Sequence, residues 1–121
     1  MNYSLYLFQQ FYWKDKVRFD LPSSRYPSWV MFAVENGDFR YQIEDISGKA
    51  TAGDVVICPP NTDFYRVMDK PLSFHYFKFY LSDESTEAIE QTRATLRNLF
   101  SFKYTPFEKT RLFNDLWHLY H

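Results

Sequence analysis

Two stretches of the sequence, GDVVICPP at residues 53–60 and PLSFHYFKFYL at residues 71–81, decide the fold. Each begins at a glycine or proline and continues as an apolar and aromatic run of strand length. Pro59 and Pro60 must leave the hydrogen-bonded ladder, because neither has a backbone N–H to donate. Together with residues 61–65, which follow the first stretch, they predict a strand, a tight turn and a strand in a small antiparallel barrel.

Upstream of this pair the pattern continues as short strands and turns. The unbroken apolar run Trp29–Val34 predicts a strand that is buried on both faces. Gly37, with Asn36 or Asp38 beside it, predicts a hairpin into residues 39–43, where apolar and polar residues alternate. Residues 47–49, Ser-Gly-Lys, predict a further turn.

The N-terminal third is rich in aromatic residues. Residues 3–13 are extended in character, and Tyr6 and Phe8 fit either an arm over the barrel or an ordinary edge strand. Residues 17–19 predict another short strand, and residues 22–28 form a turn-rich break. Short strands with turn signals every 8 to 12 residues or so indicate a sandwich or barrel.

After Ser82 the pattern changes to helix. Residues 83–93 are polar and favour a helix, whereas residues 94–103 fit irregular chain or a strand equally well. Thr105 and Glu108 flank Pro106 as a capping box, which predicts a helix running to His121. No glycine closes this helix, so we expect the native protein to continue beyond His121.

The terminal helix carries an apolar arc that is too broad for one small barrel to cover. Packing of this arc on its own barrel and packing against a second copy both remain open, and we expect a homodimer because symmetric pairing is the commonest assembly. The predicted dimerisation residues are Leu112, Phe113, Leu116, Trp117, Leu119 and Tyr120.

Composition limits the class of protein. A chain of 121 residues holds one domain, and its net charge of −1 gives no reason to expect direct contact with nucleic acid or an anionic membrane. No signal peptide and no apolar run near the roughly 20 residues of a membrane span are present. The single cysteine, Cys58, fits a small buried hydrophobe better than a redox sensor. We therefore expect a cytoplasmic protein without a membrane partner.

Gly53 and Pro59 match the second conserved motif of cupins, Gly-x5-Pro-x-Gly-x2-His, and this part of the chain resembles that family. Asn61 and Phe64 stand where the motif has glycine and histidine, and residues 26–37, which correspond to the first motif, contain no histidine. The whole chain has three histidines, too few for the cupin metal site of three histidines and a carboxylate. We therefore expect no metal and no cofactor, and no enzyme activity.

Residues 53–60 have the pattern Gly-Asp, three apolar residues, one variable residue (Cys58) and Pro-Pro. With Pro-Leu at residues 71–72, they are similar to the N-terminal domain of AraC-type transcription regulators. The resemblance covers about residues 29–121. It implies a mainly β, cupin-type jelly-roll barrel with an N-terminal arm in residues 1–82, and a helical dimerisation region with C-terminal α-helices in residues 83–121. It also implies that DNA is bound only through a C-terminal domain absent from this chain.

The family comparison also implies a function. Members sense a small molecule in the barrel, so the chain resembles the effector-sensing and dimerisation domain of a DNA-binding transcription regulator, and a sugar is one candidate effector. The alternative is a stand-alone metal-free cupin that binds a small metabolite or acts as a small-molecule enzyme. In a third interpretation the aromatic residues fill the barrel and the domain serves dimerisation alone.

The resemblance implies ligand-binding roles for four residues. Strand alternation places His75, Phe77 and Phe79 on one face, and Lys78 marks the opposite face as the wetter one, so His75 and Phe77 are predicted to point into the barrel. Tyr65 and Asn36 match pocket positions of the family. At the Asn36 position the family has an arginine, so the neutral amide predicts that an anionic effector would lose its best partner. Each has an alternative role: a buried histidine for His75, core rings for Tyr65 and Phe77, and a turn residue for Asn36.

Overall fold

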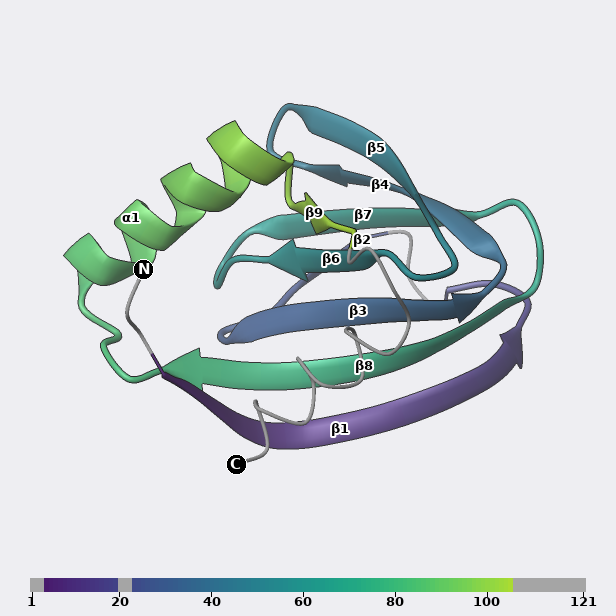
Figure 1. Cartoon of the computed structure of the whole chain (residues 1–121), viewed down its shortest axis with the longest axis horizontal. Helices are drawn as coiled ribbons and strands as arrows, with labels where there is room; N and C mark the ends of the chain where they lie inside the picture. Colours follow the sequence, from purple (N-terminus) through teal and green to yellow (C-terminus); the bar gives the residue numbers. More distant parts are fainter. Residues whose placement is uncertain (1–3, 20–22, 106–121) are drawn as a thin grey trace.

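The structure, a computed structural model, describes residues 4–19 and 23–105, which form two facing antiparallel sheets and a helical segment (Figure 1). The first sheet has the strand order β1-β8-β3-β6-β9, and the second has the order β2-β7-β4-β5. The first sheet is built from β1 (Leu5–Lys16), β8 (Leu72–Leu81), β3 (Trp29–Asn36), β6 (Val55–Cys58) and β9 (Lys103–Tyr104). The second is built from β2 (Ser23–Arg25), β7 (Asp63–Met68), β4 (Asp38–Ile43) and β5 (Ile46–Thr51).

This strand order is that of a jelly roll. Strands 1, 8, 3 and 6 face strands 2, 7, 4 and 5, so the chain crosses from one sheet to the other at most of its turns. The predicted fold class, a mainly β jelly-roll barrel, is confirmed. The predicted strand of residues 55–58 has the same bounds as β6.

Strand β3 lies at the centre of the first sheet between β8 and β6, and residues 29–34 are all buried. One face of β3 looks toward the second sheet, where the Phe32 ring lies 5.1 Å from that of Phe64 on β7. On the other face, the Trp29 ring stacks at 6.1 Å on that of Phe79. The prediction of a strand buried on both faces is confirmed, because the helical segment covers part of the outer face.

The predicted hairpin around Gly37 is wrong. β3 and β4 belong to different sheets, and at Gly37 the chain crosses between them. Gly37 has a φ of +89°, and a Cβ there would lie 2.3 Å from the carbonyl oxygen of Pro71. A hairpin turn and a short connection between two sheets both place a glycine with positive φ between two apolar segments. The local sequence pattern therefore could not distinguish them.

The predicted turn at residues 47–49 is also wrong, because these residues lie within β5. Gly48 is a strand residue opposite Tyr41, and a Cβ there would lie 2.5 Å from the Tyr41 hydroxyl. The absence of a side chain at Gly48 thus leaves room for the Tyr41 ring, and the residue does not form a turn. The hairpin of the second sheet joins β4 and β5 through Glu44, with a φ of +56°, and Asp45.

The N-terminal residues form an edge strand. β1 pairs with β8 along its length, with irregular register between Leu7 and Gln9 and between Trp13 and Lys16. Tyr6 and Phe8 belong to this strand, which agrees with the edge-strand alternative. The strand predicted at residues 17–19 is not formed. Phe19 instead directs its ring toward the intersheet core, 6.0 Å from the ring of Phe32.

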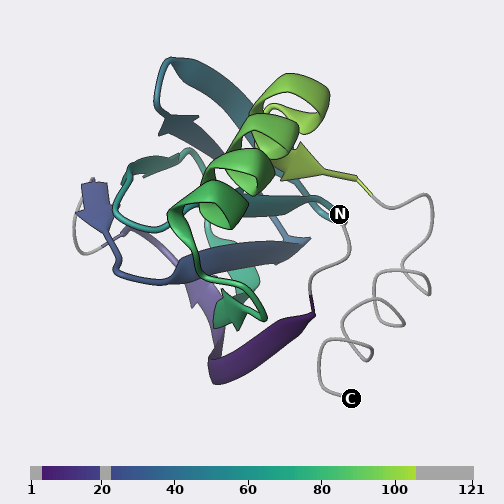
Figure 2. The ribbon, with the colours of Figure 1, turned by 90° about the vertical axis from the view of Figure 1, so that its left-hand side faces the viewer.

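The helical segment lies in front of the strands when the molecule is turned by 90° (Figure 2). α1 (Thr86–Thr95) begins at Ser85, whose hydroxyl accepts a hydrogen bond from Ala88 N, and falls where sequence predicted a helix. The π-helical segment η1 (Leu96–Phe100) follows, and β9 then pairs with β6. Residues 94–103, left open by the sequence pattern, thus return the chain to the first sheet.

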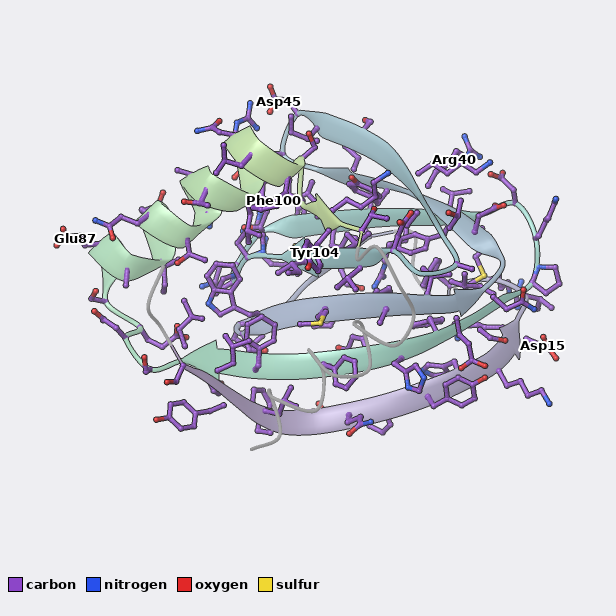
Figure 3. All side chains as sticks on the ribbon, in the orientation of Figure 1. Asp15, Arg40, Asp45, Glu87, Phe100 and Tyr104 are labelled. Atoms are coloured by element: carbon purple, nitrogen blue, oxygen red, sulfur yellow. The ribbon has the colours of Figure 1, made fainter. Side chains whose placement is uncertain are left out.

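Charged side chains fasten this segment to the β4–β5 hairpin. Arg93 Nη1 lies 2.8 Å from Glu44 Oε1 and 2.8 Å from the Thr62 hydroxyl, and Arg97 pairs with both Glu44 and Asp45. Asp45 lies beside the end of the helical segment, and the labelled rings of Phe100 and Tyr104 lie near β9 (Figure 3). No helix in the described parts of the chain has the length and apolar character that a membrane span requires.

Candidate functional site

A cavity of about 330 Å³ lies between the two sheets, toward β1, β2, β7 and β8. Its walls are mainly aromatic, with rings from Phe11, Trp13, Phe19, Phe32, Phe74, Tyr26 and Tyr76. Its polar lining side chains are Lys16, Ser24, Arg66 and Lys78, together with the two tyrosine hydroxyls. Phe11 and Trp13 are each 46% exposed, so the cavity opens to solvent along β1. A concave, mostly apolar site with a few converging polar groups is the usual form of a small-molecule site.

Strand β8 supplies one wall. Phe74, Tyr76 and Lys78 alternate along it and face the second sheet, while the residues between them face outward. The Phe32 ring lies 4.9 Å from that of Phe74 and 5.2 Å from that of Tyr76, forming the aromatic floor of the cavity. Packed rings of this kind fix the cavity's shape, since each has few torsions to vary.

Arg66 on β7 is the most deeply buried charge of the site. It is 5% exposed, and its strand parity is that of the core residue Phe64. Its Nη1 donates to the Tyr26 hydroxyl at 2.9 Å and its Nη2 donates to Ser24 Oγ at 2.8 Å. The guanidinium carbon also lies 4.9 Å from the centre of the Phe19 ring. Hydrogen bonds and rings together hold the guanidinium in one orientation.

Two lysines bring further positive charge to the cavity. Lys78 Nζ lies 5.2 Å from the ring centre of Tyr26 and 5.8 Å from that of Tyr76. Lys16 Nζ lies 4.2 Å from the ring centre of Trp13. Asp and Glu do not occur among the described residues that line the cavity. The described lining is therefore cationic, in contrast to the net charge of −1 of the whole chain.

The two tyrosines differ in acidity. Burial raises the pKa of Tyr26, but the charge of Arg66 and hydrogen bonds with Ser24, Arg66 and Tyr76 outweigh burial, so the pKa is lowered overall. Burial, and then the neighbouring Tyr26, raise the pKa of Tyr76. Tyr76 thus keeps its proton firmly, whereas Tyr26 is the tyrosine from which a proton is more easily withdrawn.

None of the four sequence-predicted ligand residues lines this cavity. The prediction that His75 and Phe77 point into the barrel is wrong, because both lie on the outer face of β8. His75 pairs with Glu35 at 3.4 Å, and Phe77 is buried. The ligand-binding roles themselves stay predictions.

Asn36 and Tyr65 lie elsewhere. The Asn36 side chain accepts a hydrogen bond from Gly37 N at 3.1 Å at the crossing between sheets, as its alternative role as a turn residue requires. Tyr65 is exposed on the second sheet and lines a surface depression with Arg25 and Arg93. The six predicted dimerisation residues, Leu112 to Tyr120, lie outside the described residues.

Sequence reasoning missed Arg66, Tyr26 and Lys78. Arg66 alternates with Phe64 in a run of strand length, and an arginine at an inward position would have drawn attention to the cavity. The charge of Lys78 favours an outward-facing position, but a lysine at the inner face can also keep its ammonium group in water where the cavity is open to solvent. Tyr26 lies in a turn-rich segment whose sequence carries no periodic signal.

A second cavity, of about 220 Å³, lies between the helical segment and the outer face of the first sheet. Its lining is almost wholly apolar and includes Trp29, Phe79 and Leu96. With Thr92 as its only polar described lining residue, it lacks the converging polar groups that would orient a ligand.

The residues of the jelly roll do not fit the metal site of cupins. Nowhere in residues 4–19 and 23–105 do three His, Cys, Asp or Glu side chains gather in a way that could hold a metal ion. The histidine that these ranges contain, His75, faces away from the intersheet cavity. Cys58 is buried, and burial raises its pKa to about 12, which keeps it a thiol.

No protein-family model and no curated protein sequence matches the chain. Among solved structures, it is similar to a cupin superfamily protein from Desulfitobacterium hafniense DCB-2, with a TM-score of 0.49, 11% identity and coverage of 59% of this chain and 63% of that one. A cupin protein from Bacteroides fragilis gives a TM-score of 0.47 and 11% identity, covering 63% of this chain and 65% of that one.

ToxT from Vibrio cholerae, in a structure with bound unsaturated fatty acid, gives a TM-score of 0.45 and 13% identity, and covers 97% of this chain and 51% of that one. The chain thus spans less than two thirds of the length of each of these proteins. The jelly-roll assignment itself rests on the strand order of this chain.

Proposed function

We propose that the chain is the effector-sensing and dimerisation domain of an AraC-type, DNA-binding transcription regulator of the cytoplasm, and that its effector is a small molecule bound between the two sheets. The observation that carries the proposal is the intersheet cavity of about 330 Å³ with Arg66, Lys78 and two tyrosine hydroxyls in its walls. The proposed role is binding and signalling, without catalysis.

The polar groups argue against a simple packing defect. A guanidinium that is 95% buried costs several kcal/mol to desolvate unless it is well paired, so a cavity meant only for packing would be lined by apolar side chains. Here the hydroxyls of Tyr26 and Ser24 hold Arg66 at the cavity wall. Fixed polar groups in an aromatic site orient a ligand.

The regulator part of the proposal is supported by sequence. Residues 53–60 and 71–72 carry the pattern that resembles AraC-type regulators, and the DNA-binding units of that family would lie outside this chain. Dimerisation through the apolar arc of residues 112–120 belongs to the same proposal.

The position of β1 supports a way to transmit binding. Phe11, Trp13 and Lys16 contribute to the cavity from this strand, and among the described strands β1 lies at the edge of its sheet with β8 as its one partner. Edge strands with irregular register are held by fewer interactions than central ones. A bound ligand would therefore order β1 and change the surface that it presents to a partner.

The test is a thermal-unfolding screen of small metabolites, including sugars and organic acids. A ligand at 100 times its Kd should raise the stability by about 2.7 kcal/mol. Matched variants on β8 locate the site: Lys78→Met on the inner face should reduce the shift, and His75→Ala on the outer face should preserve it. A shift lost only in His75→Ala would contradict the proposal, as would a native gene that ends near His121 without two helix-turn-helix units.

The lowered pKa of Tyr26 favours a second candidate function, a small-molecule enzyme. A phenol held beside a guanidinium in a cavity can give up and take back a proton during a reaction. Conversion of a screened compound by the wild-type chain, absent in Tyr26→Phe, would favour this enzyme over the sensor.

A further inference from the structure

We propose that the ligand of the intersheet cavity is a carboxylic acid in its anionic form, attached to an aromatic or aliphatic body. This inference rests on the proposed small-molecule site and assigns its ligand class. It replaces the expectation, drawn from Asn36 alone, that an anionic effector would lack a partner.

The first argument is the position of Lys78. Its ammonium lies over the rings of Tyr26 and Tyr76 at the cavity, and no described carboxylate lies within ion-pair distance of it. A cation that is partly withdrawn from water gains more from an anionic partner than an exposed one does. Lys78 is therefore placed to receive a negative charge that enters the cavity.

The second argument is the balance of hydrogen-bond donors and acceptors. Lys78 can only donate, and the oxygens of Tyr26 and Ser24 already accept from Arg66. A sugar offers many hydroxyl protons, which need acceptors that these described side chains largely lack. A carboxylate offers two acceptor oxygens and no proton, which matches a site rich in donors.

The third argument is the remainder of the wall. Phe11, Trp13, Phe32 and Phe74 bound most of the cavity, so the ligand's body must be apolar to gain from burial. A phosphate of similar size would bring a second negative charge, whose desolvation is costlier in an aromatic site. A monoanionic head on an apolar body fits both halves of the cavity.

The experiment uses pairs of carboxylates and their primary amides: 3-phenylpropionate with 3-phenylpropionamide, 2-naphthoate with 2-naphthamide, and decanoate with decanamide. Titration calorimetry measures the Kd of each compound for the whole chain, and phenyl phosphate is an additional probe. In every pair that binds, the carboxylate should bind at least about 10-fold tighter, as a hydrogen bond to a charged group predicts.

Charge variants place the head group. Lys78→Gln should weaken carboxylate binding by about 10-fold and leave amide binding unchanged, and Lys70→Gln, on the exposed turn before β8, should change neither by more than about 2-fold. Lys16→Gln is the second variant at the cavity. If circular dichroism shows that Lys78→Gln does not fold, the carboxylate affinity of Lys16→Gln is measured instead, and a loss is expected there.

The outcomes separate the two proposals. Amides that bind as tightly as their carboxylates, or phenyl phosphate that binds tighter than both, would overturn the carboxylate inference and leave a small-molecule site. If none of these probes and none of the screened metabolites binds, the proposed function itself is overturned.

Discussion

The two faces of β8 carry different tasks, although they belong to the same ten residues. The inner face, with Phe74, Tyr76 and Lys78, combines aromatic rings with a charge beside an open cavity. On the outer face Phe77 and Phe79 are buried, His75 is partly exposed, and Phe79 packs where the helical segment covers the sheet. The difference teaches that a charged residue can face the inside of a barrel when that inside holds a cavity that is open to solvent.

The outer face should dominate stability. Replacing Phe79, which is 3% exposed and stacks on Trp29, by alanine should lower the free energy of unfolding by about 3–5 kcal/mol. Urea titration followed by circular dichroism measures the loss, and Lys78→Gln is the inner-face control, with an expected change below about 1 kcal/mol. A larger loss in Lys78→Gln than in Phe79→Ala would reverse the comparison.

The first sheet also has a part that is closed to water, around Cys58 on β6, and alkaline titration can reveal it. Burial raises the pKa of the Cys58 thiol from 9.0 to about 12, so between these pH values the folded protein keeps a proton that the unfolded chain loses. This contribution to stability is complete below pH 9 and falls with rising pH, by about 1.4 kcal/mol per unit.

Cys58→Ala should remove this part of the slope. The measurement is the urea midpoint of both proteins at pH 7, 9.5 and 10.5. Equal alkaline slopes in the wild type and the variant would show that the thiol is accessible to water, which would contradict its burial.

The fastening of the helical segment should have an intermediate effect. Arg93→Ala removes hydrogen bonds to Glu44, Thr62 and the carbonyl of Pro60, and should cost about 1–3 kcal/mol. Arg25→Ala removes the exposed pair with Asp63 and should cost less, because exposed ion pairs contribute little to stability. Thermal unfolding compares the stability of the two variants. Equal losses of stability would mean that the hydrogen bonds of Arg93 do not hold the helical segment on the outer face of the sheet.

His75→Ala should have the smallest effect. The side chain lies on the outer face, pairs with the half-exposed Glu35 at 3.4 Å and contacts the Tyr12 ring, so we expect a change in stability within about 0.5 kcal/mol. The affinity for any ligand found in the screen should stay within about 2-fold of the wild type. Loss of binding in this variant alone would restore the sequence-based ligand role of His75.

Most of the fold was accessible from sequence because it depends on local signals. The run Trp29–Val34 and the prolines after Cys58 predicted β3 and β6 correctly, since a buried strand and a chain that must leave a ladder have few alternatives. The turns predicted at Gly37 and Gly48 were wrong for the same reason. Each glycine makes room for a distant group, the carbonyl of Pro71 or the ring of Tyr41, which no local pattern reveals.

The candidate site was much less accessible. Alternation on β8 separated its residues into two sets correctly, but it could not say which set faced the second sheet. That choice depends on contacts of Phe32 with Phe64 and Phe74, made between strands far apart in the sequence. The hydrogen bond between Arg66 and Ser24 depends on the pairing of β2 with β7, which the sequence pattern does not reveal.

The pairing of β1 with β8 also has a consequence for synthesis in the cell. The hydrogen bond from Ser4 N to the hydroxyl of Ser82 joins residues that are 78 positions apart. At translation rates of about 5–20 residues per second, the first strand leaves the ribosome roughly 4–16 s before its partner is complete. Through that interval the nascent chain exposes Phe8, Phe11 and Trp13 without a neighbouring strand. The first sheet therefore closes only after β8 has been synthesised, and until then the aromatic side chains of β1 are open to non-native contacts.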